Sequence, residues 1–426
     1  MVFQVVTPET VGFSGERLER LAGWMQRQVK GERLPGLSLL VHRRGQVAFA
    51  RCVGMADVEA GKPVRDDTIF RIYSMTKPIT AVAAMMLYEE GCFQIDDPIA
   101  RFLPEFTDMQ VWAGGEPGQM RTVPAEAPIT VRQLMTHTAG FTYGFMEATP
   151  VDAFYREHKI NFEGRGLTLA EMTERLAQAP LLCQPGSQWN YSVAIDVLGR
   201  LVEVWSGMPL DQFFDERILQ PLGMTDTAFS VPEHKLDRFA ACYGPATGGG
   251  LSGVNAPKAG ITDVAGVGIK LTEAPDKSRF TGPVSLFSGG GGLTGTLADY
   301  ARFCQMLLNG GELDGMRLLG RKTVSFMGLN HLPGNADMAA MGQPVWSETQ
   351  TDGIGYGLGM AVVLDPAAAQ VMSSPGEIHW GGAASTAFWI DPAEQLFVVL
   401  MTQLLPSSTY PLRRELRVLT YQALID

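Results

Sequence analysis

RIYSMTKPIT, residues 71–80, places a serine and a lysine three residues apart, with a proline directly after the lysine. Side chains at this spacing are neighbours on one helix face, so Ser74 and Lys77 are predicted to lie together. Pro78 has no backbone N–H and disfavours helical geometry at the residue before it, so a helix can only be starting here. Ser74 would then lie near a helix N-terminus, where unpaired N–H groups favour developing negative charge.

Ser74 and Lys77 form a catalytic pair only if the lysine can take the proton of the serine. A serine hydroxyl is a weak nucleophile until a neighbour accepts its proton, and a lysine does so where burial or a nearby cation favours its neutral amine. The flanking residues are apolar and favour burial: Ile72, Met75, Ile79 and Val82. The alternative is an N-capping serine beside an exposed lysine, and S-x-x-K alone does not decide between the two.

The sequence on either side of this segment predicts one sheet assembled from both ends of the chain. Residues 36–54 indicate two strands around a turn at Arg44-Gly45, and residues 385–404 indicate two apolar strands around Asp391-Pro392. We therefore expect the first and last parts of the chain to pair within a single sheet.

Helices are predicted at both ends and in the middle of the chain. One runs from an N-cap at Ser14 to Gly31, and another covers residues 412–425. Residues 95–285 contain many Pro and Gly, several helical segments and little strand alternation; within them, residues 245–260 are expected to form an exposed loop. The predicted fold class is α/β (α+β): a sheet domain of residues 1–94 and 286–426, interrupted by a mainly helical domain of residues 95–285.

The composition excludes several classes of function. A net charge of −11 and a pI near 5.1 argue against a nucleic-acid or anionic-membrane partner, which would need a basic face. No segment is long and apolar enough to span a bilayer, and the N-terminal residues do not resemble a secretion signal, so a cytoplasmic location is expected. The five cysteines are scattered and are expected to be buried thiols rather than disulfides or metal ligands.

Two further patterns in the sequence do not predict a cofactor or metal site. Residues 290–295, GGGLTG, match G-x-G-x-x-G, but the sequence that follows is a loop and turn and predicts no parallel strand of a dinucleotide-binding unit. The six histidines show no metal-ligand spacing, so no metal or cofactor is predicted. His137 is expected to be structural, and His379 could help to shape a pocket without being catalytic.

Three motifs in order resemble the penicillin-recognising serine hydrolases. SMTK (residues 74–77) matches their S-x-x-K, PGSQWNYSV (residues 185–193) resembles the motif that carries a tyrosine, and HWGG (residues 379–382) resembles the third motif, before a strand pair. Supporting stretches occur in the same order, and the likeness extends from about residue 36 to residue 404. The resemblance implies a β-lactamase-like fold, with an antiparallel sheet flanked by helices and a mainly helical second domain.

The chain departs from the class C β-lactamases at two motif positions. Where those enzymes have Y-x-N and K-T-G, this chain has Tyr191-Ser192-Val193 and Trp380-Gly381-Gly382. Val193 cannot hydrogen-bond the side-chain amide of a β-lactam, and Trp380 removes the cation that would receive its carboxylate. A site without these polar groups should prefer neutral, apolar acyl groups. The pattern is similar to that of the family VIII carboxylesterases, which implies a substrate pocket formed by Val193, Trp380, Gly381 and Gly382.

The resemblance also implies a mechanism. Ser74 would attack an ester carbonyl and form an acyl-enzyme, while Lys77 and Tyr191 would share the proton transfers. The sequence does not decide which of the two is the base, because coupled groups titrate together. The backbone N–H groups of Ser74 and Ala383 would form the oxyanion hole.

The expected function is therefore that of a serine carboxylesterase acting on small-molecule esters with short apolar acyl groups, with weak β-lactam hydrolysis in addition. One alternative is an acyltransferase that passes the acyl group to an alcohol. Another is a class C-type β-lactamase or D-alanyl-D-alanine peptidase. A third, a non-enzymatic binding protein of the same fold, is disfavoured because a binder needs no matched nucleophile and base.

Overall fold

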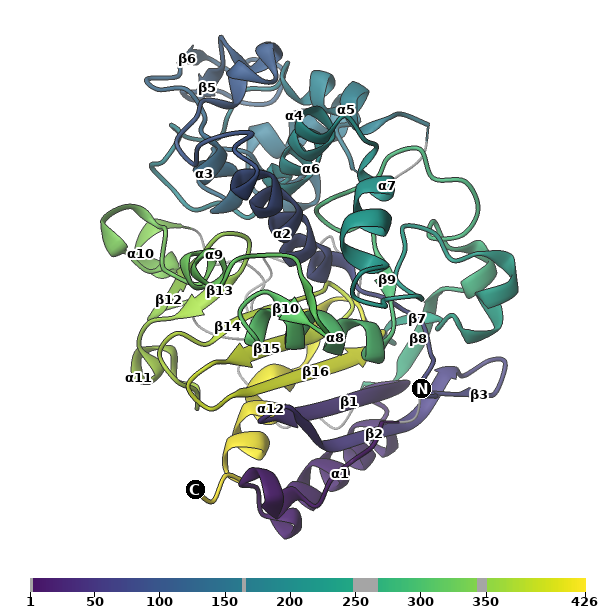
Figure 1. The fold of residues 1–426 in the computed structure, drawn as a ribbon. Helices are drawn as coiled ribbons and strands as arrows, with labels where there is room; N and C mark the ends of the chain where they lie inside the picture. Colours follow the sequence, from purple (N-terminus) through teal and green to yellow (C-terminus); the bar gives the residue numbers. More distant parts are fainter. Residues whose placement is uncertain (1–2, 163–165, 248–266, 343–350) are drawn as a thin grey trace.

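An eight-stranded antiparallel sheet forms the centre of the fold (Figure 1). The computed structural model describes residues 3–162, 166–247, 267–342 and 351–426. In sheet order, the strands are β12 (Ile354–Tyr356), β13 (Ala361–Val363), β14 (Ile378–Gly381), β15 (Ala387–Asp391), β16 (Leu396–Thr402), β1 (Gly36–Arg43), β2 (Gln46–Asp57) and β3 (Lys62–Pro63). The loop predicted over residues 245–260 lies outside the described residues from residue 248 onward.

The two ends of the chain meet in the middle of this sheet, as predicted. β1 pairs with β16 from Leu37 opposite Thr402 to Arg43 opposite Leu396. The turn between β1 and β2 has positive φ angles at Arg44 and Gly45, which suit a tight hairpin. Both β1 and β16 are buried along their whole length, because helices cover both faces of the sheet.

The helices that cover the sheet come from both parts of the chain. α1 and α12 pack against one face, and α8 packs against β1, β15 and β16 (Figure 1). α1 starts after Ser14, whose hydroxyl accepts a hydrogen bond from the backbone N–H of Arg17, as the predicted N-cap requires. The helix bounds are α1 (Gly15–Lys30), α2 (Thr76–Glu89), α3 (Val131–Met135), α4 (Pro150–Glu157), α5 (Leu169–Leu176), α6 (Ala194–Ser206), α7 (Leu210–Phe214), α8 (Leu297–Leu308), α9 (Arg321–Met327), α10 (Met338–Met341), α11 (Pro366–Ala369) and α12 (Leu412–Tyr421).

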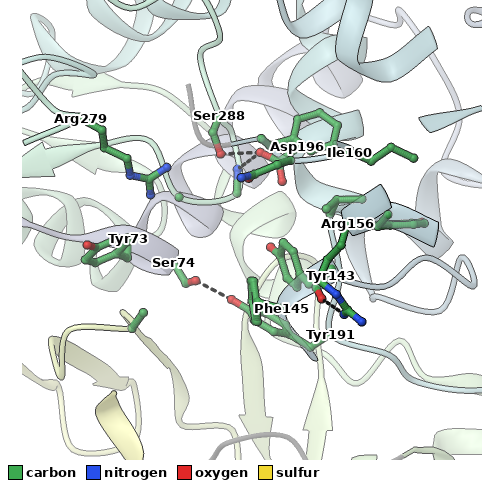
Figure 2. Close-up of a pocket in the computed structure, with 18 of the residues that line it drawn as sticks. Tyr73, Ser74, Tyr143, Phe145, Arg156, Ile160, Tyr191, Asp196, Arg279 and Ser288 are labelled. Atoms are coloured by element: carbon green, nitrogen blue, oxygen red, sulfur yellow. Dashed lines mark hydrogen bonds between the residues drawn. The ribbon is translucent and has the colours of Figure 1, made fainter. Parts of the chain in front are cut away.

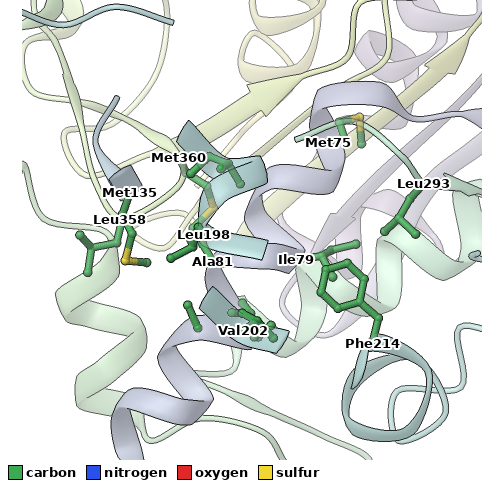
Figure 3. Packing of buried hydrophobic residues seen from close by; sticks show 14 of the residues in the cluster. Met75, Ile79, Ala81, Met135, Leu198, Val202, Phe214, Leu293, Leu358 and Met360 are labelled. Carbon is green, nitrogen blue, oxygen red and sulfur yellow. The ribbon is translucent and has the colours of Figure 1, made fainter. Parts of the chain in front are cut away.

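α2 is the central helix, buried on all sides from Thr76 to Leu87. It begins two residues before Pro78, although proline disfavours helical geometry at the residue before it. Proline is tolerated there because the first N–H groups of a helix have no partner within the helix. α2 packs against α6, and their apolar side chains meet in one cluster that also includes Met135 and Phe214 (Figure 3).

The same core cluster continues into the sheet, because it also contains Phe397, Val399 and Met401 of β16. The sheet and the helical region therefore share apolar packing around α2. The predicted antiparallel sheet flanked by helices is confirmed, whereas the domain boundaries at residues 94 and 286 stay a prediction.

Four two-stranded sheets complete the described fold. Their strands are β4 (Phe70–Arg71) with β9 (Thr294–Gly295), β5 (Gln110–Trp112) with β6 (Thr122–Pro124), β7 (Cys242–Pro245) with β8 (Ile269–Glu273), and β10 (Glu312–Leu313) with β11 (Met316–Arg317). All five cysteines are free thiols, but the prediction that they are buried is wrong for Cys52 and Cys92, which are partly exposed. Cys52 lies on β2, near the edge of the sheet, and Cys92 follows the end of α2.

Candidate active site

Ser74 lies on a strained turn between a strand and the central helix. β4 leads into a 3-10 turn over Tyr73–Met75, and α2 follows directly. Tyr73 has a φ of 43°, which is rare for a bulky residue and typical of strained backbone at functional sites. Its buried ring packs edge-on against Phe280, with 5.6 Å between ring centroids. This turn directs the Ser74 hydroxyl into a cavity, toward Tyr191 (Figure 2).

Two polar side chains reach the Ser74 hydroxyl. The Tyr191 hydroxyl donates to Ser74 Oγ at 2.5 Å, and Lys77 Nζ donates to the same oxygen at 3.2 Å. Lys77 is in the first turn of α2, whereas Tyr191 lies just before α6. The structure thus brings together the three predicted catalytic residues, although 114 positions of sequence separate Lys77 from Tyr191.

The Lys77 amine is fully buried and has two further hydrogen-bond partners. Lys77 Nζ donates to the carbonyl of Gly290 at 2.6 Å and to the Tyr143 hydroxyl at 3.1 Å. It also lies 4.6 Å from the centroid of the Tyr191 ring. These contacts fix the amine beside Ser74, so its position does not depend on a flexible side chain.

The carbonyl of Gly290 belongs to a glycine-rich loop, residues 288–292. Asp196, on the first turn of α6, accepts hydrogen bonds from the Ser288 hydroxyl at 2.5 Å and from the Gly290 N–H at 3.0 Å. Burial raises the pKa of the Asp196 carboxyl above its ordinary value. A Cβ at Gly290 would clash with this carboxyl, so the close approach requires glycine.

This loop is the segment that matched the dinucleotide pattern. It enters β9, which pairs antiparallel with β4, so the parallel strands of a dinucleotide-binding unit do not form here. Gly290 and Gly291 line the same cavity as Ser74. The loop therefore belongs to the candidate active site, where it holds Lys77.

The third motif lies at the end of β14, beside the Ser74 turn. A Cβ on Gly382 would clash with the carbonyl oxygen of Ile72, and one on Gly381 would clash with the carbonyl oxygen of Thr386 as well as with the Arg413 side chain. Both glycines are therefore needed for close packing. In the part of the chain that the structure describes, neither Ser74 nor Ala383 donates its backbone N–H to another backbone carbonyl, and Ala383 lines the cavity.

The predicted pocket residues take different positions. Val193 lines the cavity, but Trp380, Gly381 and Gly382 are not among the residues that line it. The Trp380 ring packs against the rings of Tyr191 and Tyr356, with centroids 5.5 Å and 5.3 Å away. Trp380 thus supports Tyr191 from behind, and direct contact of its side chain with substrate stays a prediction.

The cavity above Ser74 has a volume of about 730 Å³, within the usual range for small-molecule sites. Its lining includes the apolar and aromatic side chains Phe145, Tyr155, Ile160 and Phe162. Three cationic residues also line it: Arg156, Lys159 and Arg279. The cavity is therefore lined by both apolar and cationic side chains.

Sequence reasoning missed three groups of this site: the Tyr143 hydroxyl, the Asp196 carboxyl and the Gly290 carbonyl. Each belongs to a segment far from Lys77 in the chain, so no local spacing could connect it to the lysine. One signal was available for Gly290, since a run of four glycines before a helix is typical of close backbone approach.

His137 is buried beside the site but is not placed to act as a base. Its Nδ1 lies 3.3 Å from the Ser192 hydroxyl, and its ring packs against Tyr191 with 4.9 Å between centroids. Burial, and secondarily the Lys77 charge, hold the pKa of His137 well below its usual value. The imidazole is therefore neutral near pH 7 and serves packing, although its Nε2 has no hydrogen-bond partner among the described residues.

The described part of the chain offers neither a metal site nor a membrane-spanning helix. Within the described ranges, no three His, Cys, Asp or Glu side chains come together in a way that could hold a metal ion. None of the described helices combines the length and the apolar character needed to cross a membrane.

Known proteins with similar sequences and folds define the class. Residues 21–422 match the sequence model of the Beta-lactamase family, and the chain belongs to that family. It is 36% identical over 384 residues to the protein Rv1367c from Mycobacterium tuberculosis, covering 88% of this chain and 86% of that protein. It is 35% identical over 390 residues to the esterase EstB from Burkholderia gladioli, covering 90% and 89%.

Among solved structures, a similar one is EstCE1, described as a hydrolase with promiscuous acyltransferase activity. It aligns with a TM-score of 0.77 and 30% identity, covering 95% of this chain and 99% of that one. The resemblance inferred from the motifs is thereby confirmed: the chain is a serine hydrolase of the β-lactamase fold.

Proposed function

We propose that this protein is a serine carboxylesterase with Ser74 as the nucleophile. The position of the Ser74 side chain is the observation that carries the proposal. Ser74 lines the cavity, and the side chains of Tyr191 and Lys77 both form hydrogen bonds with its Oγ. A nucleophile within hydrogen-bond distance of a base, with that base held by further groups, is the arrangement that nucleophilic catalysis requires.

In the acylation step, Ser74 Oγ attacks the ester carbonyl carbon and its proton passes to the Lys77–Tyr191 pair. The carbonyl π electrons move onto oxygen, which the N–H groups of Ser74 and Ala383 would stabilise. When the tetrahedral intermediate collapses, the carbon–oxygen bond to the alcohol breaks. The pair returns the proton to the leaving alkoxide, and the acyl group stays on Ser74.

Deacylation repeats these steps with water as the nucleophile. Water loses a proton to the Lys77–Tyr191 pair and attacks the acyl carbon, and the proton returns to Ser74 Oγ as the carboxylic acid leaves. The two groups act as one unit because their side chains converge on the same oxygen, so the apparent pKa values of the reaction belong to the pair.

The apolar side chains that line the cavity support the proposed substrate class. Phe145, Ile160 and Phe162 offer an apolar surface for an acyl group, and Val193 occupies the place where a hydrogen-bonding amide would serve a β-lactam. We therefore expect turnover of short apolar acyl esters and weak turnover of β-lactams. The esterase activity in the name of the relative EstB supports this choice.

Acyl transfer to an alcohol is the second candidate function. The deacylation chemistry is the same when an alcohol replaces water, and the similar structure EstCE1 is described as having promiscuous acyltransferase activity. The competition between water and alcohol for the acyl-enzyme decides between the two functions.

Hydrolysis of p-nitrophenyl acetate, butanoate and octanoate by the wild type and Ser74→Ala tests the proposal, with a chromogenic cephalosporin measured alongside. We expect Ser74-dependent hydrolysis of the short esters and little reaction with the cephalosporin. Faster cephalosporin turnover would assign a β-lactamase, and ester turnover that rises sharply with added alcohol would assign an acyltransferase. Undiminished ester hydrolysis by Ser74→Ala would refute the proposed nucleophile.

A further inference from the structure

Arg279 projects its guanidinium group into the cavity beside the Ser74 turn (Figure 2). The group lies over two aromatic rings, with Cζ 4.7 Å from the centroid of Phe280 and 5.7 Å from that of Tyr73. Such contacts stabilise a cation and orient its plane. Tyr73 directly precedes Ser74, so the cation stands next to the turn that carries the nucleophile.

The backbone around Arg279 is held in place on both sides. Ser278 and Phe280 are buried. The Ser278 hydroxyl accepts from the Phe280 N–H at 3.2 Å, and the Phe280 carbonyl accepts from the Val231 N–H at 2.7 Å. A side chain that starts from a fixed backbone and rests on fixed rings loses little entropy when it binds a ligand.

No carboxylate of the described residues lies within 4.0 Å of the Arg279 guanidinium. Three acidic side chains line the same cavity, Glu147, Asp196 and Glu273, and the last two are engaged elsewhere. Glu273 accepts from Arg71 Nε at 2.7 Å, and Asp196 accepts from Ser288 and Gly290. Arg279 is therefore a cation that protein carboxylates leave unpaired, inside a partly enclosed cavity where an ion pair is stronger than in open water.

From this geometry we infer that Arg279 binds an anionic group of the substrate, a carboxylate or a phosphate, that lies on the alcohol side of the ester. The inference rests on the proposed esterase function. Among the lining residues, the apolar side chains Phe145, Ile160 and Phe162 would receive the acyl chain. Arg279 lies across the cavity from Ile160 (Figure 2). A guanidinium matches either anion because it can donate two parallel hydrogen bonds.

This inference refines the substrate class expected from the motifs. Trp380 does remove the cation of the third motif, but Arg279 supplies another cation from a different segment. The substrate would be an ester of an apolar acid with an alcohol or phenol that carries a negative charge. A neutral ester would still react, because Arg279 does not contact the Ser74–Lys77–Tyr191 group.

Three butanoate esters of similar shape test the inference: those of meta-hydroxybenzoate, of meta-hydroxyphenyl phosphate and of neutral meta-hydroxybenzamide. In Arg279→Gln we expect kcat/KM to fall about 10- to 100-fold for an anionic ester, as for a lost hydrogen bond to a charged group, and to stay within about twofold for the benzamide ester. Arg279→Lys should fall between, because it keeps the charge but loses the paired donors. A loss confined to the benzoate or to the phosphate ester identifies the anion.

The matched control is Lys159→Gln, which removes another cation from the same cavity and should leave the ratio of anionic to neutral turnover unchanged. If Lys159→Gln lowered kcat/KM for the anionic esters as much as Arg279→Gln does, the overall positive charge of the cavity would explain the preference. That result would overturn the assignment to Arg279. So would an equal loss on all three esters in Arg279→Gln, or no loss on any of them.

Binding without turnover separates this inference from the proposed function. In the Ser74→Ala protein, calorimetry with the intact benzoate ester should show binding that weakens about 10- to 100-fold when Arg279→Gln is added. That result supports the anion site even if no ester is hydrolysed through Ser74. Binding that is indifferent to Arg279 overturns the site while leaving the esterase proposal in place.

Discussion

The Lys77 amine has three hydrogen-bond partners, and their number bears on how it could work. An ammonium group has three donors, which match Ser74 Oγ, the Tyr143 hydroxyl and the Gly290 carbonyl. A neutral amine could donate to Gly290 and Tyr143 and keep its lone pair for the Ser74 proton. The same cage therefore fits the amine before and after it takes the proton, with little movement of heavy atoms.

Replacement of Lys77 is the first test at the scale of single residues. Lys77→Met keeps an unbranched side chain in this fully buried position, so the fold should persist while kcat/KM falls about 10²- to 10⁴-fold, as for loss of a general base. Lys159→Met, at the rim of the same cavity, is the control and should stay within a fewfold of wild type. Near wild-type ester turnover by Lys77→Met, with an unchanged melting temperature, would contradict the role of Lys77.

The two tyrosines of the site should differ in importance. The Tyr191 hydroxyl donates a hydrogen bond to Ser74 Oγ, whereas the Tyr143 hydroxyl accepts one from Lys77 Nζ. We expect Tyr191→Phe to lower kcat about 10²-fold or more, and Tyr143→Phe to cost only about tenfold and to shift the pH profile of kcat/KM. Steady-state kinetics across pH would measure both, and a larger loss in Tyr143→Phe would reverse the assignment.

At this scale the motifs predicted that Ser74, Lys77 and Tyr191 lie together, as they do in the structure, whereas their catalytic roles stay a prediction. The motifs did not predict Tyr143 or the Gly290 carbonyl. Their roles arise from contacts across 66 and 213 positions of chain, and a backbone carbonyl has no residue type that could mark it.

Among the elements, the glycine-rich loop and the Ser74 turn depend on each other. β4 and β9 pair from Phe70 opposite Gly295 to Arg71 opposite Thr294, which places the loop against the first turn of α2. The Thr76 hydroxyl also accepts a hydrogen bond from the Leu293 N–H at 3.1 Å. Lys77 and the Gly290 carbonyl that accepts its hydrogen bond are thus positioned by the same short sheet.

Two neighbouring glycines of this loop offer a matched pair of variants. A Cβ at Gly290 would clash with the Asp196 carboxyl, whereas at Gly291 its nearest neighbour would be a Tyr73 backbone atom at 3.8 Å. Gly290→Ala should displace the loop and lower kcat/KM about tenfold or more, with a loss of stability of about 1–3 kcal/mol. Gly291→Ala should stay near wild type in both. Equal effects of the two variants on activity and on chemical denaturation would contradict this account of the loop.

Elements near the chain ends were easier to predict than the placement of the third motif. The β1–β2 and β15–β16 hairpins follow from apolar strands around turn residues, and α1 follows from its N-cap. Trp380 is expected in the substrate pocket because its motif resembles the third motif of the penicillin-recognising serine hydrolases, which carries a substrate-binding cation in the class C β-lactamases. Its ring packs against the rings of Tyr191 and Tyr356, and its contact with substrate stays a prediction, because strand alternation alone does not decide which neighbour an aromatic ring will contact.

For the whole molecule, buried histidines make stability depend on pH. His42, on β1, is 7% exposed and stacks on Phe397 with 4.4 Å between ring centroids. Burial lowers the pKa of His42 to about 4, so the folded state keeps it neutral while the unfolded state binds a proton near pH 6.5. The contribution of neutral His42 to the free energy of unfolding is therefore fully present above pH 6.5, and it is lost as the pH falls toward 4.

Replacement of His42 should make the free energy of unfolding less dependent on pH below pH 6.5. We expect His42→Gln to reduce the loss of unfolding free energy between pH 6.5 and pH 4 by up to about 3 kcal/mol, measured by denaturant titration at each pH. The exposed His234→Gln serves as the control. An unchanged pH dependence in His42→Gln would show that other groups carry the acid sensitivity.

The sheet assembled from both termini was predictable because strand signals gather at the two ends of the chain. The extent of the shared core was not, since α2 carries apolar residues around its whole circumference and joins α6 to β16 in one cluster. Helical periodicity identifies a helix that has one apolar face, but not the partners of a helix that is apolar on every face. The packing of the helical region on the sheet therefore had to come from the structure.

The central claim is that Ser74 carries the acyl group, and trapping the acyl-enzyme tests it most directly. The protein would be mixed with p-nitrophenyl butanoate, quenched in acid at the steady state, digested and analysed by mass spectrometry. We predict a butanoyl group on Ser74 in the wild type, retained longer when Tyr191→Phe slows deacylation, and no adduct in Ser74→Ala. A butanoyl group on another residue, with ester turnover preserved in Ser74→Ala, would contradict the account.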